Sequence, residues 1–212
     1  MEADFWHDKW EANQIGFHKA EANPLLIVHF PALGLAKGAR VFVPLCGKTL
    51  DIPWLLAQGM RVAGAELSTL AVEQLFNDMG VTPEVAEVGA LKRYSAEGVD
   101  IYAGDIFDLT AAELGAIDAV YDRAALVALL DAMRARYAAH LAEITARAQQ
   151  LVICFEYDQR KMNGPPFSVS PAEVKRVHGE RYGLTAIHSG PMTGGLKGVV
   201  EAEETVWLLR SV

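Results

Sequence analysis

The sequence predicts an α/β fold in which helices cover both faces of a mostly parallel, seven-stranded sheet, as a three-layer sandwich. Short apolar segments rich in β-branched residues alternate along the chain with segments of helical period, a pattern typical of parallel sheets. The last two apolar segments have no helix between them, which predicts an antiparallel hairpin at the C-terminal end. We expect one domain of residues 1–212, because this length suits a single buried core.

The alternating part of the chain begins at residues 40–45 (RVFVPL), an apolar strand bounded by Gly38 and Gly47. Residues 51–58 have helical spacing, and Gly59 follows as a helix-ending residue. The later strands are predicted at residues 61–67, 100–103, 117–121, 150–157, 184–189 and 205–212. The later helices are predicted at residues 69–79, 111–114, 124–133 and 137–148, with a last helix from Pro171 to Gly179 or Gly183.

The first 35 residues are expected to be helix and loop, and aromatic side chains are concentrated there. Trp6 and Trp10 are four residues apart, so they share one face of a helix. Such a face can pack the helix onto the domain, and it can also cover a ligand at the edge of the sheet. We expect residues 1–35 to form a helical lid over the binding site.

Composition indicates where the protein is located and which classes of partner it binds. The 19 basic and 27 acidic residues give a net charge of −8, and the basic residues are scattered, which argues against a nucleic-acid partner. No apolar run approaches the ~18–20 residues of a membrane span, and the acidic N-terminus is unlike a signal peptide. The two cysteines form neither a disulfide framework nor a zinc pattern. We expect a monomeric cytoplasmic protein that binds a small molecule and no metal.

Four groups of residues stand where a predicted strand ends. They are residues 45–51 (LCGKTLD) after the first strand, Glu66 at the end of the second, residues 105–107 (DIF) after the third, and Asp122 with Arg123 after the fourth. Open parallel sheets bind ligands at the carboxyl ends of their strands. The four groups are therefore expected to converge on one crevice.

Each group fits one part of a nucleoside that carries an amino-acid tail. Gly47 lets the backbone approach the ligand, and Glu66, 19 residues later, is close to the ~20-residue offset of an acid that binds ribose hydroxyls. Asp105 can accept from an adenine amino group, with residues 106–107 packed on the base. Arg123 can pair with a carboxylate. Taken singly, each also fits a plainer role as a helix cap, a turn or a surface ion pair.

Two common phosphate-binding motifs are missing from the first loop. Gly47-Lys48-Thr49 resembles the end of a P-loop, but the position that needs a second glycine is Phe42, inside the strand. The dinucleotide pattern G-x-G-x-x-G is also absent. These absences favour a nucleoside without phosphates, such as S-adenosylmethionine, over NAD.

Six segments carry a resemblance that runs in order across nearly the whole chain. They are Trp6-x-x-x-Trp10, Gly16-Phe17-His18, residues 43–51 (VPLCGKTLD), Gly64-x-Glu66-Leu67-Ser68, Gly104-Asp105-Ile106-Phe107 and residues 121–126 (YDRAAL). These segments resemble the bacterial thiopurine S-methyltransferases, and PLCGKTLD is specific to that family in a way that a lone glycine loop is not. The resemblance implies a Rossmann-like fold, S-adenosylmethionine as cofactor and S-adenosylhomocysteine as product.

The resemblance also implies roles for individual residues. Trp10, Leu45, Glu66 and Arg123 fall on the family's cofactor positions, and Trp6, Asp105 and Ile106 look like further cofactor contacts. Gly47, Asp51 and Phe107 complete the expected cofactor site. The expected substrate contacts are Phe17, Arg123 and Lys197, of which Lys197 stands near a C-terminal position where some family members have an arginine.

The expected reaction is a direct displacement, in which the substrate's thiolate takes the methyl group and no covalent enzyme intermediate forms. Arg123 is the candidate catalytic residue, because its charge can position the aromatic thiol and favour its ionised form. Two alternatives stay open. One is methylation of selenium or tellurium species, giving oxyanion resistance, and the other is a non-catalytic nucleotide-binding protein of the same fold.

Overall fold

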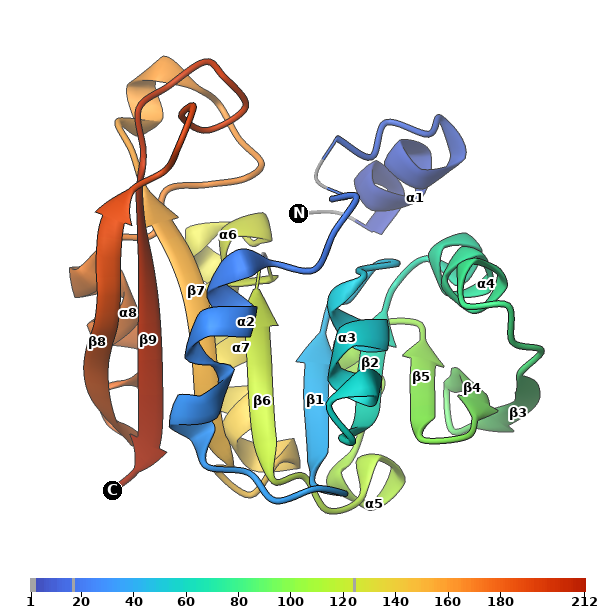
Figure 1. The fold of residues 1–212 in the computed structure, drawn as a ribbon. Helices are drawn as coiled ribbons and strands as arrows, with labels where there is room; N and C mark the ends of the chain where they lie inside the picture. Colours follow the sequence, from blue (N-terminus) through green and yellow to red (C-terminus); the bar gives the residue numbers. More distant parts are fainter. Residues whose placement is uncertain (1–2, 17, 124) are drawn as a thin grey trace.

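The structure, a computed structural model, describes residues 3–16, 18–123 and 125–212, which form one nine-stranded sheet covered by helices (Figure 1). The strand order is β3-β4-β5-β2-β1-β6-β7-β9-β8. The strands are β1 (Arg40–Pro44), β2 (Arg61–Glu66), β3 (Glu84–Val88), β4 (Leu91–Ala96), β5 (Val99–Ala103), β6 (Ala119–Arg123), β7 (Gln149–Glu156), β8 (Tyr182–Pro191) and β9 (Glu203–Ser211). The helices are α1 (Ala3–Glu11), α2 (Pro24–His29), α3 (Asp51–Ala57), α4 (Thr69–Asp78), α5 (Ala111–Leu114), α6 (Ala125–Ala128), α7 (Asp131–Ile144) and α8 (Pro171–His178), with 3-10 turns η1 (Phe30–Leu33), η2 (Ile106–Asp108) and η3 (Gln159–Lys161).

Five adjacent strands, β5-β2-β1-β6-β7, run parallel and form the centre of the sheet. In the pairing of β1 with β2, Arg40 lies opposite Arg61 and Pro44 opposite Ala65. These strands are buried on both faces, which explains why each reads as an apolar run. Their carboxyl ends meet at one edge, the upper edge in Figure 1, as the sequence predicted.

The predicted C-terminal hairpin is confirmed. β8 pairs antiparallel with β9, and β9 joins the sheet by pairing antiparallel with β7. Both strands are longer than predicted, since β8 runs to Pro191 and β9 begins at Glu203. The loop of residues 192–202 between them rises above the carboxyl edge beside the loop that follows β7 (Figure 1).

The predicted count of seven strands is wrong, because the sequence analysis missed an antiparallel hairpin formed by β3 and β4. β4 pairs antiparallel with β5, so the hairpin extends the sheet beyond its parallel centre. β3 (EVAEV) is exposed at four of its five positions, and β4 (LKRYSA) is fully buried only at Leu91 and Tyr94. With so little burial, such an edge hairpin has no strong apolar signal in the sequence.

The predicted helix boundaries around residues 124–148 are also wrong. α6 ends at Ala128, and α7 then runs without a break from Asp131 to Ile144. Leu130 adopts an extended conformation (ψ 147°), which separates the two helices. Arg134 lies inside the fold and is only 5% exposed. Its guanidinium Nε donates to the carbonyl of Leu129, which partly satisfies this buried polar group.

Helices cover the sheet in two layers, which confirms the three-layer prediction. α5, α6, α7 and α8 pack on one face, and α2, η1, α3 and α4 pack on the other. Leu26 of α2, with Phe30 and Leu33 of η1, is buried in the second layer. The segment from Asn23, which caps α2, to Leu33 is therefore part of the core. Of the predicted lid, only the part before Asn23 lies at the carboxyl edge (Figure 1), and its action as a lid stays a prediction.

His178, at the end of α8, is a fully buried histidine whose two ring nitrogens have no hydrogen-bond partner among the described residues. Its ring lies edge-on to Tyr182, with 6.2 Å between the ring centres. Burial, together with the charge of Arg181, lowers the pKa of His178 to about 4. A histidine in the unfolded chain titrates near 6.5, so the unfolded state binds the proton more readily between these two values.

We predict that the free energy of unfolding falls as the pH is lowered from about 7 to 5, by roughly 2 kcal/mol from this residue. The depressed folded pKa means that the loss begins below the unfolded value and is complete near pH 4. In His178→Phe this part of the pH dependence should disappear, whereas His7→Phe, in the partly exposed α1 helix, should retain it. Urea unfolding of the three proteins at pH 7 and pH 5 measures the difference, and equal slopes for all three would contradict the prediction.

Candidate active site

The loop after β1 has an unusual backbone at the carboxyl edge. Leu45 has φ +47° and Gly47 has φ +52°. Both therefore adopt the left-handed backbone conformation, which residues other than glycine rarely take. The N–H of Cys46 between them donates to the carbonyl of Ala65 at 3.0 Å, which ties the loop to β2. A left-handed leucine costs on the order of 1–3 kcal/mol and is typical of positions held for function.

Glu66 ends β2 and lies under this loop. Its side chain is 6% exposed; one carboxylate oxygen accepts from the N–H of Gly47 at 2.7 Å and the other from the N–H of Ser68 at 2.9 Å. Burial raises the pKa of Glu66, and the backbone donors of Ser68 and Gly47 partly reverse that rise. A carboxylate has about four acceptor positions, so Glu66 can bind further hydroxyl donors while it holds both loops.

α1 covers the loop after β1 through Trp10. The Trp10 side chain is 4% exposed, and a Cβ atom on Gly47 would lie 3.1 Å from its Cζ2 atom. Trp6, one turn earlier, is partly buried and meets Phe5 edge-on, with 5.3 Å between ring centres. Figure 1 shows α1 beyond the ends of the central strands, on the side of α4. Trp10 thus packs on the backbone of the predicted cofactor loop.

Asp51 is buried and fastens three segments together. One carboxylate oxygen accepts from the N–H of Asn23 at 2.7 Å, and the other accepts from the Tyr121 hydroxyl at 3.0 Å. The chain before α2 and strand β6 are both held to the start of α3 in this way. Its carboxylate is engaged within the protein, and a direct contact with a cofactor stays a prediction.

The segment after β5 presents its three residues in different directions. Asp105 is exposed and caps η2, accepting from the N–H of Phe107 at 3.0 Å. Ile106 is buried, and the Phe107 ring lies against α7, with the Arg136 guanidinium 3.7 Å from the ring centre and the His140 ring 5.4 Å away. Of the three, Asp105 is the best placed to meet a ligand, and Phe107 packs on a helix.

Two of the three predicted substrate residues, Arg123 and Lys197, lie on the other side of the edge. Arg123 is half-buried at the end of β6, and its charge adds to the effect of burial and of the Lys48 charge in lowering the pKa of His18. Lys197 is exposed in the loop after β8, and its Nζ donates to the carbonyl of Pro165 at 2.9 Å. Lys197 thus joins the two raised loops, and Phe17 lies outside the described residues.

Glu204 of β9 is a candidate site residue that sequence reasoning missed. It is half-buried, and burial raises its pKa, while the charges of Arg123, His188 and Lys19 lower it in part. The signal was an acid in a strand with apolar residues on both faces: Val206 and Leu208 pack in the core on the face of Glu204, and Trp207 and Leu209 pack in the core on the opposite face. An acidic residue at a position of core period is a candidate functional residue.

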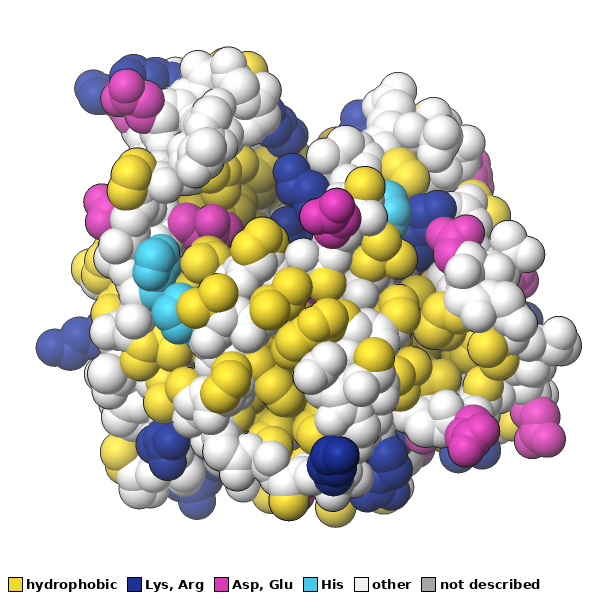
Figure 2. Space-filling view, viewed as in Figure 1, with side chains coloured by type: hydrophobic (Ala, Val, Ile, Leu, Met, Phe, Trp, Pro, Cys, Tyr) yellow, Lys and Arg dark blue, Asp and Glu magenta, His cyan; other side chains and the backbone are white. Residues whose placement is uncertain are grey.

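Between the two sides, the surface is hollowed. Figure 2 shows a recess at the upper edge between two raised parts, with apolar side chains on its floor and Lys or Arg side chains beside it. The raised loops contain an apolar cluster of Tyr157, Leu196, Val200 and Ala202. No helix among the described residues is long and apolar enough to span a membrane.

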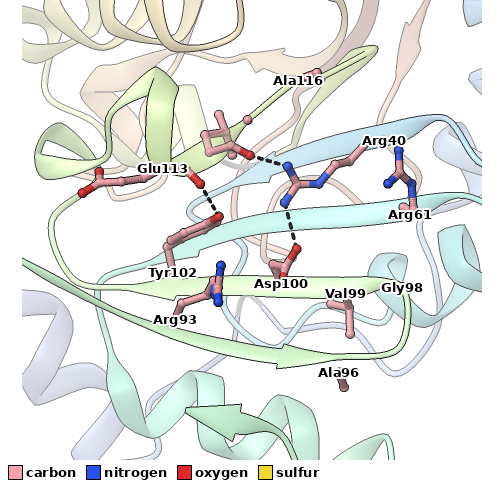
Figure 3. Close-up of a pocket in the computed structure, with 12 residues that line it drawn as sticks. Arg40, Arg61, Arg93, Ala96, Gly98, Val99, Asp100, Tyr102, Glu113 and Ala116 are labelled. Carbon is pink, nitrogen blue, oxygen red and sulfur yellow. Dashed lines mark hydrogen bonds and ion pairs between the residues drawn. The ribbon is translucent and has the colours of Figure 1, made fainter. Parts of the chain in front are cut away.

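A second cavity, of about 440 Å³, lies at the opposite edge of the sheet among Arg40, Arg61 and Arg93 (Figure 3). Arg40 is paired with Asp100 at 2.9 Å and also donates to the carbonyl of Leu114. These contacts join the start of β1 to β5 and α5. Because ligands of open parallel sheets bind at the carboxyl edge, this cavity is not the candidate active site.

Two solved structures with this fold are methyltransferases. A 1,6-didemethyltoxoflavin-N1-methyltransferase of Burkholderia thailandensis, with its substrate and S-adenosylhomocysteine bound, has a TM-score of 0.66 at 16% identity and covers 99% of this chain and 87% of its own. An S-adenosylmethionine-dependent methyltransferase of Anabaena variabilis has a TM-score of 0.67 at 12% identity, with coverage of 99% and 95%. The fold is that of the Rossmann-like, S-adenosylmethionine-dependent methyltransferases.

Sequence comparison gives the family within this class. A family model for thiopurine S-methyltransferase matches residues 1–211. The thiopurine S-methyltransferase of Xanthobacter autotrophicus is 60% identical over 210 residues, 99% of each chain, and that of Pseudomonas aeruginosa is 43% identical over 215 residues, again 99% of each. The chain belongs to the thiopurine S-methyltransferase family, which confirms the resemblance found in its motifs.

We predict that Gly47→Ala displaces Trp10, because the added Cβ would lie 3.1 Å from the indole in a backbone conformation that alanine resists. Gly80→Ala is a matched control, since Gly80 has a similar φ of +69° with nothing within 4 Å of the added Cβ. Both variants should lose about 1 kcal/mol of stability to backbone strain, and only Gly47→Ala should change the tryptophan fluorescence. Identical emission spectra for the two variants would show that Trp10 does not depend on this contact.

Proposed function

We propose that this enzyme transfers the methyl group of S-adenosylmethionine to the sulfur of an aromatic or heterocyclic thiol of the thiopurine type. The observation that carries the proposal is the buried Glu66 carboxylate, held under Gly47 and Trp10 at the carboxyl edge. Support for the cofactor comes from fold relatives whose structures contain S-adenosylhomocysteine. Support for the thiol comes from relatives that are named thiopurine S-methyltransferases.

The residues at the edge fit a nucleoside with an amino-acid tail. Glu66 would accept the ribose hydroxyls, and Asp105 would accept from the adenine amino group. Because Gly47 has no Cβ, Trp10 can pack closely against the loop. The face of its indole suits a positively charged sulfonium. Leu45, Trp6 and Ile106 would complete the cofactor site, with Gly47.

The chain's own contribution to the reaction is placement and exclusion of water. S-adenosylmethionine supplies an electrophilic methyl group, which a thiolate can take by direct displacement. Arg123 would hold the substrate sulfur and favour its ionised form. Burial raises the pKa of both Cys46 and Cys154 well above the usual value, so the two thiols stay protonated at neutral pH. Neither cysteine is therefore suited to act as a nucleophile, in keeping with direct transfer.

The surroundings of Arg123 favour an aromatic substrate over an inorganic oxyanion of selenium or tellurium. The loops raised above the recess contain a buried apolar cluster that includes Tyr157, Leu196 and Val200, and the loop of residues 192–202 carries Lys197 but no arginine. Lys197 is held by the carbonyl of Pro165, so Arg123 is the main cation offered to a ring that carries a single negative sulfur. A small oxyanion would gain more from several cations.

We predict that S-adenosylhomocysteine binds saturably and raises the melting temperature, and that Glu66→Ala weakens binding about 100-fold or more. The expected loss corresponds to hydrogen bonds from ribose hydroxyls to a buried carboxylate, each worth about 1.5–3 kcal/mol. Glu87→Ala, on the exposed strand β3, is the control and should bind like the wild type. Calorimetry measures the affinities, and an affinity of Glu66→Ala within twofold of the wild type would refute the ribose assignment.

Methyl-transfer assays test the substrate class. With S-adenosylmethionine present, we expect turnover of aromatic and heterocyclic thiols, and little or none of selenite or tellurite. Arg123→Met should lower kcat/KM for thiols by about 10²-fold, because one charge that stabilises the sulfur anion is lost. A faster reaction with an oxyanion would favour the chalcogen alternative, and cofactor binding without any turnover would favour the non-catalytic one.

A further inference from the structure

Arg123 and Glu204 emerge from the same face of the sheet at its carboxyl edge. Arg123 lies opposite Ile153 of β7, and Ile153 lies opposite Val206 of β9. Glu204 is two residues from Val206 and therefore shares its face. One strand separates β6 from β9, so the two backbones are about 10 Å apart. Two long side chains of opposite charge thus extend from the same face of the sheet, with Ile153 of β7 between their backbones.

The Glu204 carboxylate has hydrogen-bonding capacity that the protein does not use. It is half-buried, yet among the described residues no hydrogen bond or ion pair reaches it. Arg123, His188 and Lys19 act on it only through longer-range charge interactions. The oxygens of Glu204 are not among the buried atoms that lack a partner, so water reaches them, and a donor group of a ligand in the recess can take the place of that water.

Glu203, the neighbouring residue, shows the contrast. Its side chain is exposed and accepts a hydrogen bond from the Ser189 hydroxyl at 2.7 Å. Strand alternation directs it to the opposite face of β9. The two adjacent acids therefore lie on opposite faces of the sheet, and only Glu204 is on the face of Arg123.

We propose that Glu204 binds the ring N–H of a heterocyclic thione and takes its proton, an inference that rests on the methyl transfer proposed above. An S–H group is a weak donor, whereas a ring N–H is a strong one and suits a carboxylate. In such a thione the N–H and the C=S groups are on neighbouring atoms. Both groups lie on one edge of the ring, where the N–H can donate to Glu204 while the sulfur is near Arg123, so the pair of residues selects this tautomer.

The proton transfer balances within the site. The N–H bond breaks, an O–H bond forms on Glu204, and the electron pair left on nitrogen conjugates with the C=S group. Negative charge therefore collects on sulfur, where Arg123 stabilises it. The sulfur then has the electron pair that bonds to the methyl group, and Glu204 returns the proton to water after the product leaves.

Binding to the complex with S-adenosylhomocysteine tests this role without turnover. Calorimetry compares pyridine-2-thione, which has the ring N–H, with N-methylpyridine-2-thione, which lacks it. In the wild type and in Glu203→Gln the first ligand should bind at least ~30-fold more tightly, and in Glu204→Gln the two affinities should lie within about threefold. Equal affinities in the wild type would overturn the inference whether or not the variant folds.

Turnover adds the substrate comparison. Glu204→Gln should lower kcat/KM for pyridine-2-thione by about 10²-fold, the usual scale of proton-transfer catalysis, and should leave thiophenol, which has no ring N–H, within threefold. An equal loss for both substrates would overturn the role in proton transfer. A wild-type enzyme that methylates neither compound would refute the proposed function, and the calorimetric gap would still decide whether Glu204 reads the N–H.

Discussion

The buried carboxylate of Glu66 fixes the two loops from which the carboxyl edge is built. By accepting from the N–H groups of Gly47 and Ser68, it holds the end of β1 and the start of α4 at set positions. Ser68 in turn caps α4 by accepting from the N–H of Ala71. Burying a carboxylate is costly, and backbone donors offset that cost only while both loops keep their shape. Trp10 packs on Gly47, so the position of α1 also depends on this carboxylate.

A second buried carboxylate links the loop after β1 to strand β6, the two parts of the edge proposed for cofactor and substrate. Asp51 accepts from the Tyr121 hydroxyl, and Tyr121 precedes Arg123 by two residues on β6. Burial raises the pKa of Tyr121 well above its usual value, so the hydroxyl stays a donor. One hydrogen bond thus holds the start of α3, which follows the loop after β1, to the strand that carries Arg123. The same carboxylate holds Asn23, which separates α1 from the core helices.

Sequence reasoning was strongest where burial is strong. The parallel strands are apolar throughout, and the family motifs lie at their ends, so the fold class and the edge that carries the site followed from the sequence. The β3–β4 hairpin was missed because its strands are mostly exposed. The orientation of Phe107 toward Arg136 and the pairing of Asp51 with Tyr121 depend on contacts between distant segments, which periodicity does not report. Glu204 was missed because no motif marked it, although its place in a strand with apolar residues on both faces was readable.

The central claim is that cofactor and substrate meet at the carboxyl edge, with Glu66 on one side and Arg123 on the other. A crystal structure with S-adenosylhomocysteine and a methylated aromatic thioether tests it most directly. The account predicts the ribose hydroxyls within hydrogen-bond distance of Glu66 and the thioether sulfur between the adenosylhomocysteine sulfur and Arg123. A ribose bound away from Glu66, or ligands in the cavity of Arg40, Arg61 and Arg93 at the opposite edge, would contradict it.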